Sequence, residues 1–525
     1  MYFAMNTATT PEDYVEKFKA LSPAKRAFLM RALREEGGFQ RNSRMLARRS
    51  EPSAPLSFAQ KRLFFIDQMY PGNPAYNLPT AVRMRGALDV AILKQSLDDV
   101  IRHHESLRTT FEIVNNEPIQ IIGGSLDLPV PVIDLTIIEE SEREAQAHRL
   151  AIEEGKRPFD LAQGPLLRLT LIKMGEQDHV ALVTMHHIIS DAWSMGLFVR
   201  EIAAAYEAFS AGLVSPLSEP KLQYADFAVW QQEWLESEAF AEQLSYWKNR
   251  LSGATAVREL PTDHPRPPVQ TFDGAKQYLS LPNDLAVPLE ALSRAEGVTV
   301  FMTLLAVFTE LLHLYTQQED ILIGSPVDNR NRVELESIIG FFVSTQVLRT
   351  DLSGDPTFRE LMSQVREVVL GAHAHQELPF EMLVREMNLD RNLGIMPLFQ
   401  VWFVFQIAPP QATEVAGLTF SSFDVDYEMA RYDLKLDLLQ TSEGISGSFE
   451  YNRTIFDSST VQRIARQFQS LLTLVIAQPD LRLSELQRRV AESDEQQRIA
   501  ERIERNRSNR TNLKLARRKA VVQSL

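Results

Sequence analysis

The residues best suited to chemistry stand together in the stretch HHIISDAWS, residues 186–194, directly after the apolar run HVALVTM, residues 179–185. An imidazole near its ordinary pKa is the usual side chain for taking a proton at neutral pH, so His186 and His187 are candidate acid–base groups. Side chains alternate across a strand, and adjacent histidines at a strand end cannot both face the core. One imidazole is therefore expected to face a channel while the other packs inward.

Asp191 lies four residues beyond His187 and is expected to hold the loop through a buried ion pair with an arginine. It need not touch the imidazole. A metal site is a weaker hypothesis, because two adjacent histidines and one aspartate give poor geometry without another ligand. Taken alone, the pair is better explained as part of a core turn.

The elements that must position this motif can be predicted from periodicity. The runs at residues 165–174 and 179–185 flank GEQD and predict a hairpin, and a helix is expected over 196–209. Residues 89–108 carry apolar side chains at helical spacing. The Pro-rich stretch 260–275 indicates a connection between two halves, each with helices and strands.

Composition sets limits on function. The 525 residues are 44 % hydrophobic and 24 % charged, which is typical of a globular protein with a large core. The net charge of −14 argues against nonspecific binding to nucleic acid. Without cysteine there is no thiolate metal site or cysteine nucleophile, and any thioester sulfur must come with the substrate.

The most apolar long stretch, residues 300–316, carries Glu310 and His313 and predicts a buried helix rather than a membrane span. The first residues lack the basic region and long apolar run of a signal peptide. We therefore expect a cytoplasmic protein with no membrane partner.

The histidine motif is one of an ordered series. The motifs are SFAQKRLFFIDQ (57–68), RHHESLRTTF (102–111), MHHIISDAWS (185–194), YADFAVWQQ (224–232), IGFFVSTQVLR (339–349) and HQELPFE (375–381), with a weaker seventh, LDRNLGIMPLFQ (389–400). Over residues 52–480 the chain resembles the condensation domains of nonribosomal peptide synthetases. Their signature HHxxxDG is matched with Ala192 in place of glycine.

The resemblance implies an α/β fold of two chloramphenicol acetyltransferase-like αβα lobes, a V-shaped pseudo-dimer with a central tunnel. It implies four parts: an N-terminal helical linker or docking segment at 1–51, an N-terminal lobe at 52–228, a C-terminal lobe at 229–485 and a charged linker or tail at 486–525. For both ends, a solvated segment without a role is an equal alternative.

The resemblance also implies amide bond formation between a donor acyl or peptidyl thioester and an acceptor aminoacyl thioester. Upstream and downstream carrier proteins would deliver both on phosphopantetheine arms, with a neighbouring adenylation domain as a further partner. No permanently bound cofactor or metal is expected. His187 would either take the proton of the attacking amine or position that amine.

By match to the family, His187 is the catalytic residue, with His186 beside it. Asp191 is expected to form a structural ion pair with Arg108 inside the N-terminal lobe, where loss of one partner is costly.

Five further positions are candidates for substrate binding. Ala192 adds a methyl group where the family has glycine, which is tolerated if φ is negative. Trp193 is better explained by packing, and Ser194 equally well by helix capping. Ser344 and Gln346 suit a channel wall, although a buried hydrogen bond explains them nearly as well.

Other functions remain open within the same superfamily. They include an acyltransferase that uses coenzyme A thioesters, a starter-type domain with a fatty acyl donor, and, less favoured, an epimerization domain. Some relatives are non-catalytic platforms that recruit tailoring enzymes and have lost the histidine pair. Because His186, His187 and Asp191 are all present, catalysis is favoured.

Overall fold

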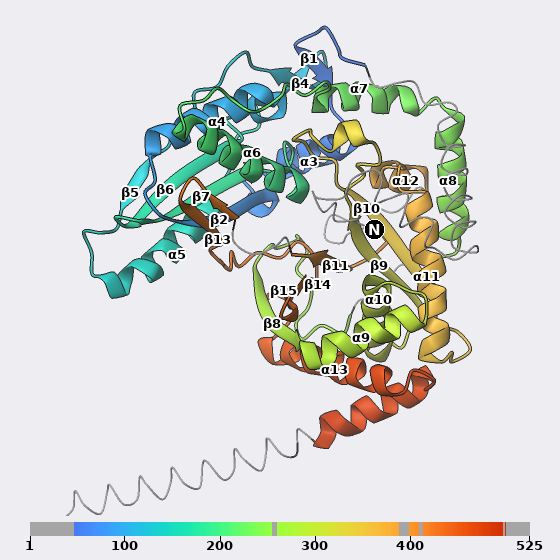
Figure 1. The fold of residues 1–525 in the computed structure, drawn as a ribbon. Coiled ribbons are helices and arrows are strands. Elements are labelled where there is room, and N and C mark those ends of the chain that lie inside the picture. The colour runs from blue at the N-terminus through green and yellow to red at the C-terminus, as the bar shows by residue number, and fades with distance from the viewer. Residues whose placement is uncertain (1–46, 255–259, 388–397, 409–412, 497–498, 500–525) are drawn as a thin grey trace, which may run out of the picture.

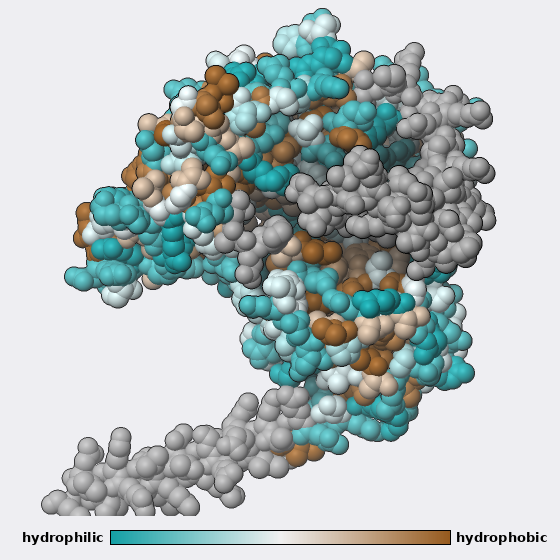
Figure 2. All heavy atoms as spheres, viewed as in Figure 1, coloured by the Kyte–Doolittle hydropathy of each residue, from teal (hydrophilic) through white to brown (hydrophobic). Residues whose placement is uncertain are grey.

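The computed structural model describes residues 47–254, 260–387, 398–408, 413–496 and 499. Most of the N-terminal segment, most of the weak seventh motif and the end of the charged tail lie outside these residues. The described residues form two lobes that open as a V (Figure 1), and Figure 2 shows a hollow between them on the face in view.

The first lobe is built on a six-stranded sheet in the order β12-β13-β2-β7-β6-β5. Its strands are β2 (Asn77–Arg85), β5 (Val132–Asp134), β6 (Leu167–Gly175), β7 (Asp178–His186), β12 (Thr413–Val415) and β13 (Leu418–Ser422). The helices are α3 (Phe58–Met69), α4 (Val90–His103), α5 (Glu140–Lys156) and α6 (Ala192–Ser210). The antiparallel pair β6–β7 confirms the predicted hairpin.

A small sheet completes this lobe. It pairs β1 (Ser53–Pro55) with β4 (Glu117–Ile122), and β4 with β3 (Thr109–Val114). Short 3-10 helices, η1 (Pro74–Tyr76) and η2 (Glu105–Arg108), precede β2 and β3.

The second lobe is built on a six-stranded sheet in the order β10-β9-β11-β14-β15-β8. Its strands are β8 (Gly274–Pro282), β9 (Asp320–Val327), β10 (Ser344–Asp351), β11 (Val401–Ile407), β14 (Leu434–Thr441) and β15 (Gly444–Asn452). Its helices are α9 (Asn283–Ala295), α10 (Val300–Thr316), α11 (Phe358–Ala374), α12 (Phe380–Glu386) and α13 (Ser458–Ala477). A third 3-10 helix, η3 (Val333–Leu335), lies between β9 and β10.

Helix α10 confirms the buried helix predicted at residues 300–316, since eleven of its side chains are buried in the core of the second lobe. In the described part of the chain, no single helix is long and apolar enough to span a membrane. Within those residues, the helix pair α9 and α10 together reaches that length and composition, and the two helices are bent by 102°.

Two connections join the lobes. Helices α7 (Tyr224–Trp234) and α8 (Glu238–Arg250) run along the outer edge (Figure 1). On the inner side, β13 from the second half pairs with β2, and residues 423–433 then lead back to β14. The second half therefore supplies part of the first lobe's sheet, which the sequence did not indicate. The predicted domain limits stay predictions.

Candidate active site

The histidine pair sits where the central strand β7 ends. Its last residue, His186, is paired in register with Asn77 of β2. The backbone N–H of His187 donates to the carbonyl of Tyr76 at 2.8 Å, and a tight turn then leads to α6. The backbones of both histidines are thereby fixed to a neighbouring strand and a 3-10 helix.

The two imidazoles hold opposite tautomers. Nδ1 of His186 accepts from the backbone N–H of Ile188 at 3.2 Å, so its proton is on Nε2. Nδ1 of His187 lies 2.7 Å from the carbonyl of Ser190, which can only accept, so this nitrogen carries the proton. Nε2 of His187 therefore carries a lone pair, and among the described residues nothing donates a hydrogen bond to it, so it can accept one from a substrate.

Burial and nearby positive charge make both imidazoles weak bases. The pKa of His187 falls from 6.5 to about 3, chiefly because of burial and then because of the charges of Arg431 and Arg62. Burial, His187 and Arg431 likewise lower the pKa of His186 to about 3. Both rings are thus neutral near pH 7. His186 is 4 % exposed, whereas His187 is only half-buried.

Asp191 binds the second half of the chain. Oδ1 accepts from the backbone N–H of Ser194 at 2.8 Å, where Asp191 caps α6, and from Nη2 of Arg330 at 3.3 Å. Oδ2 accepts from the backbone N–H groups of Phe342 and Val343, at 3.0 and 3.2 Å. The carboxylate thus ties the histidine turn to residues 342–343.

The predicted pair of Asp191 with Arg108 is wrong. Arg108 ends η2 and donates through Nη1 to the carbonyl of Gly123, whose N–H bonds in turn to the Arg108 carbonyl. The guanidinium therefore serves the turn after β4, and burial lowers its pKa. The true partner, Arg330, follows β9 in the second half, and the pair joins the lobes rather than stabilising one of them.

Ser194 has no face left for a substrate. It is fully buried, and its hydroxyl donates to the carbonyl of Gly340 at 2.9 Å. The same oxygen accepts from the backbone N–H of Gly340 at 3.0 Å and from Nη2 of Arg330 at 2.8 Å. Ser194 therefore acts with Asp191 in holding residues 340–343.

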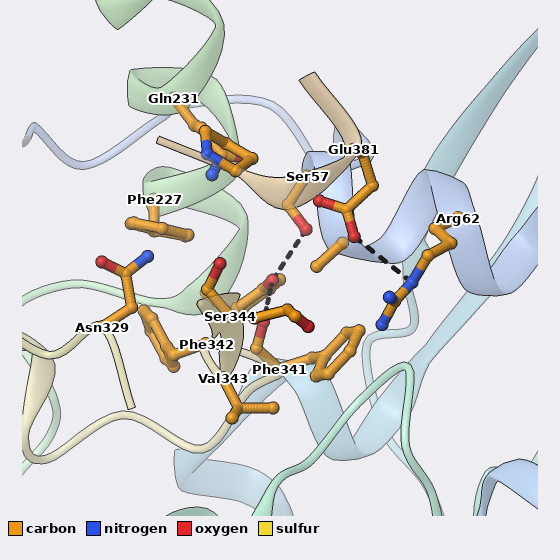
Figure 3. A pocket seen from close by; sticks show the side chains of 14 residues that line it. Ser57, Arg62, Phe227, Gln231, Asn329, Phe341, Phe342, Val343, Ser344 and Glu381 are labelled. Atoms are coloured by element: carbon orange, nitrogen blue, oxygen red, sulfur yellow. Dashed lines mark hydrogen bonds and ion pairs between the residues drawn. The ribbon is translucent and has the colours of Figure 1, made fainter. Parts of the chain in front are cut away.

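A buried tyrosine holds the same residues from the opposite side. The Tyr224 hydroxyl donates to the carbonyl of Phe341 at 2.6 Å and accepts from Ser57 Oγ at 2.8 Å (Figure 3). Its ring lies so close to Gly340 that a Cβ there would be 2.0 Å from Cδ2. Between these contacts, the ring of Phe341 packs against His187, with centroids 4.5 Å apart.

The remaining predicted binding residues are dispersed. Ala192 is exposed at the first position of α6, away from the left-handed region of φ, which meets the condition for tolerating alanine. Nε1 of Trp193 donates to the carbonyl of Glu336 at 2.9 Å. Gln346 donates to the carbonyl of Ala372 at 2.8 Å, in α11, which is a structural contact. Ser344 lines a pocket.

Two cavities come near the histidine pair, each through one residue of its wall, and neither is lined by His186 or His187. One holds about 10 Å³, room for about one water molecule, and Figure 3 shows Ser344 and the ion pair of Arg62 with Glu381 (Nε to Oε1, 3.2 Å) at its wall. Phe341 lines it too and separates it from His187. The other holds about 600 Å³, and Phe159 of its wall lies 6.0 Å from the His186 ring. Among the described residues, no His, Asp and Glu cluster could hold a metal ion.

Comparison with known proteins identifies the family. Residues 50–499 match the family model of the condensation domain. This chain belongs to that family.

Curated relatives are large peptide synthetases. The chain is 50 % identical to one component of the linear gramicidin synthase of Brevibacillus parabrevis, over 86 % of its own length but only 9 % of that protein. It is 38 % identical to phosphinothricin tripeptide synthetase PhsC of Streptomyces viridochromogenes, over 90 % of this chain and 44 % of the other. The condensation domain thus spans under half the length of these relatives.

Solved structures share the two-lobe fold. The X-domain of teicoplanin biosynthesis, in its complex with OxyB, has a TM-score of 0.77 and 30 % identity over 85 % of this chain and 98 % of the X-domain. The SgcC5 protein of Streptomyces globisporus has a TM-score of 0.70 and 29 % identity over 82 % and 100 %.

Sequence reasoning missed several residues around the histidine pair of this condensation domain. Arg62 and Phe341 lie inside the first and fifth motifs, so their positions were marked but their roles were not. Arg330 and Arg431 lie outside the motifs that were recognised. Nothing in the local sequence sets them apart from surface arginines.

Proposed function

We propose that this condensation domain forms an amide bond between a donor acyl or peptidyl thioester and an acceptor aminoacyl thioester, both carried on phosphopantetheine arms. The observation that carries the proposal is the neutral His187 ring, with Nε2 free, where the two lobes meet. Membership of the family, whose relatives include peptide synthetases, supports this reaction class.

The reaction needs little acid–base help. The lone pair of the acceptor amine forms the new C–N bond, and the carbonyl π pair moves to oxygen. That pair returns as the C–S bond breaks, and the departing thiolate takes the proton that the nitrogen loses. The products are an amide and a free pantetheine thiol. Correct orientation of the reactants alone contributes roughly 7–11 kcal/mol in well-ordered systems.

We assign His187 to positioning rather than to general base catalysis. A useful base has a pKa near the working pH, and the pKa of His187 is about 3. A neutral ring with an acceptor nitrogen can still bind one N–H of the amine and direct its lone pair to the carbonyl. His186, whose acceptor nitrogen is already bonded to the backbone, orients the turn.

The partners follow from the reaction. An upstream and a downstream carrier protein would bring the two arms, and an adenylation domain would load the acceptor. In line with this, the relatives are much longer than one domain. We propose that the folded unit extends from about residue 52 to 485, with linkers before and after it. A fatty acyl donor remains an alternative to the peptidyl donor.

A recruitment platform is a second candidate, since a structure similar to this chain is an X-domain in complex with OxyB. The free Nε2 of His187 argues against it, because a platform has no use for an ordered acceptor nitrogen.

The test is an intact-mass assay with two excised carrier domains, the donor carrier loaded from a panel of acyl and aminoacyl groups and the acceptor carrier from a panel of amino acids. The native domain is expected to move the donor onto the acceptor carrier. His187→Ala is expected to slow transfer by less than the roughly 10²–10⁴-fold that general base help supplies.

His264→Ala removes an exposed imidazole bonded to Asp457 and serves as the matched control. No amide from any loaded pair, together with capture of an oxidase, would favour the platform. An unchanged rate in His187→Ala would contradict the assigned site.

A further inference from the structure

Arg431 brings a positive charge to the histidine pair from the segment that returns to the second lobe. Its Nε donates to the carbonyl of Ala75 at 2.6 Å, and its Nη2 donates to the carbonyl of Asn77 at 3.3 Å. The carbonyl between them, on Tyr76, accepts from the backbone N–H of His187. Three consecutive carbonyls therefore hold the guanidinium and the catalytic turn side by side.

Among the described residues Arg431 forms no ion pair, and its Nη1, which is not fully buried, has no hydrogen-bond partner. The other two arginines whose charges reach the pair each have a carboxylate: Arg62 with Glu381, and Arg168 with Glu154.

A half-buried cation without an anion is costly, and it favours any negative charge that forms beside it. In the proposed reaction, that charge forms on the carbonyl oxygen of the donor when the amine attacks. Hydrogen-bond donors that are already in place for such an oxyanion are among the largest contributions to catalysis.

We propose that Arg431 is a second catalytic residue, which binds this oxyanion through Nη1–H and its charge. The inference rests on the proposed function. His187 would hold the amine on one side of the donor carbonyl and Arg431 would hold the oxygen. The two groups come from different halves of the chain, so the reaction centre is complete only when residues 423–433 lie against the first lobe.

The competing role for Arg431 is a structural brace. The bonds to Ala75 and Asn77, and the Tyr76 ring 5.2 Å from the guanidinium, fasten the returning segment to the first lobe. Loss of a purely structural contact would weaken the binding of every ligand to the same extent. Loss of a group that binds the oxyanion would weaken binding of the tetrahedral state and leave binding of the neutral thioester or amide unchanged.

The experiment therefore compares Arg431→Gln and Arg431→Lys with the native domain, using the loaded carrier pair that gives most product. In single turnover, Arg431→Gln is expected to lose about 10²–10³-fold in rate constant, the usual effect of removing one oxyanion donor, with little change in the carrier concentration for half-saturation. Arg431→Lys should recover part of the rate. Arg453→Gln, which removes an exposed arginine paired with Asp273 in the same half, is the matched control.

Binding of two dead-end ligands separates the roles. One is a phosphonamidate, with a tetrahedral P–O⁻ in place of the carbonyl, joining two pantetheine arms. The other is the corresponding amide. Arg431→Gln should weaken phosphonamidate binding by a factor similar to its rate loss and leave amide binding within about threefold. The His187 pKa, followed by NMR of labelled imidazole, should rise, because a lowering charge is gone.

If Arg431→Gln bound the phosphonamidate and the amide with equally reduced affinity, or reacted at the native rate, the inference would be overturned and the proposed function would stand. If Arg431→Gln does not fold, Arg431→Lys decides, and an equal weakening of phosphonamidate and amide binding in it would refute the role. Failure of the native domain to make any amide would remove the proposed function, and this inference with it.

Discussion

Asp191→Ala tests whether the aspartate of the histidine motif is structural. Asp191 is 2 % exposed, and its carboxylate accepts four hydrogen bonds, one of them from the buried Arg330. Alanine leaves that guanidinium without its anion. It also leaves the backbone N–H groups of Ser194, Phe342 and Val343 without their acceptor.

The expected cost follows from these contacts. Removing one partner of a buried ion pair lowers the free energy of unfolding by about 3–5 kcal/mol. At about 2–4 °C per kcal/mol for a unit of 150–250 residues, this corresponds to a fall of roughly 6–20 °C in Tm. Replacing both members by apolar residues is often close to neutral, so Asp191→Ala/Arg330→Met should be more stable than Asp191→Ala alone.

Melting of each variant and hydrogen exchange of peptides covering residues 339–343 provide the readouts. We expect Asp191→Ala to exchange faster in that segment before the rest of the lobe opens. Asp89→Ala is the matched control, since it removes an exposed carboxylate that caps α4, worth about 0.5–2 kcal/mol. An Asp191→Ala protein with native Tm and native exchange, yet without activity, would refute the structural role.

Three further predictions concern the same region. Gly340→Ala should lower the free energy of unfolding by about 1–3 kcal/mol, because the added Cβ would overlap the Tyr224 ring. The control Gly124→Ala, whose Cβ would have nothing within 4 Å, should melt like the native protein. Equal melting temperatures of the two variants would contradict the packing argument. Ala192→Gly, an exposed change at the start of a helix, should cost less than about 1 kcal/mol and leave the rate unchanged, and a large gain in rate would show that the methyl group obstructs substrate. The pKa of His187 is about 3 in the folded state and 6.5 ordinarily, so between these pH values the unfolded state binds more protons and the free energy of unfolding should fall as the pH drops. The urea midpoint of His187→Gln should fall less over this range than that of the native protein. The same dependence of the urea midpoint on pH in both proteins would contradict this prediction.

Local pattern was sufficient for the elements that carry the motif. The hairpin β6–β7 and the helix α10 follow from alternation and from helical spacing of apolar residues, which act within one element. The two-lobe architecture came from the ordered motifs rather than from periodicity. Periodicity says nothing about which strands become neighbours.

Partners across the lobes could not be predicted for a physical reason. The contact of Asp191 with Arg330 joins residues 139 positions apart, and an aspartate can pair with any arginine that the fold brings near. Arg108 stands in a motif typical of the family, but its side chain binds the adjacent turn at Gly123. Arg431 could be placed only once β13 was seen to pair with β2.

The contacts around residues 340–343 give a physical reason for the motifs to occur together. Tyr224 of the fourth motif donates to the Phe341 carbonyl and is itself bonded to Ser57 of the first motif, while the third motif holds the amides of the next two residues through Asp191. The backbone around Phe341 is thus fixed by the first lobe and by the connecting helix α7, and the ring of Phe341 fixes one face of His187. A motion that opened the lobes would have to break these buried hydrogen bonds together, so we expect opening to occur on the other side of the histidine, where Arg431 is held by two carbonyls and an aromatic ring. If His187 and Arg431 have the proposed roles, we expect the half of the centre that holds the amine to stay intact when the lobes open, and the half that binds the oxyanion to be assembled when residues 423–433 lie against the first lobe.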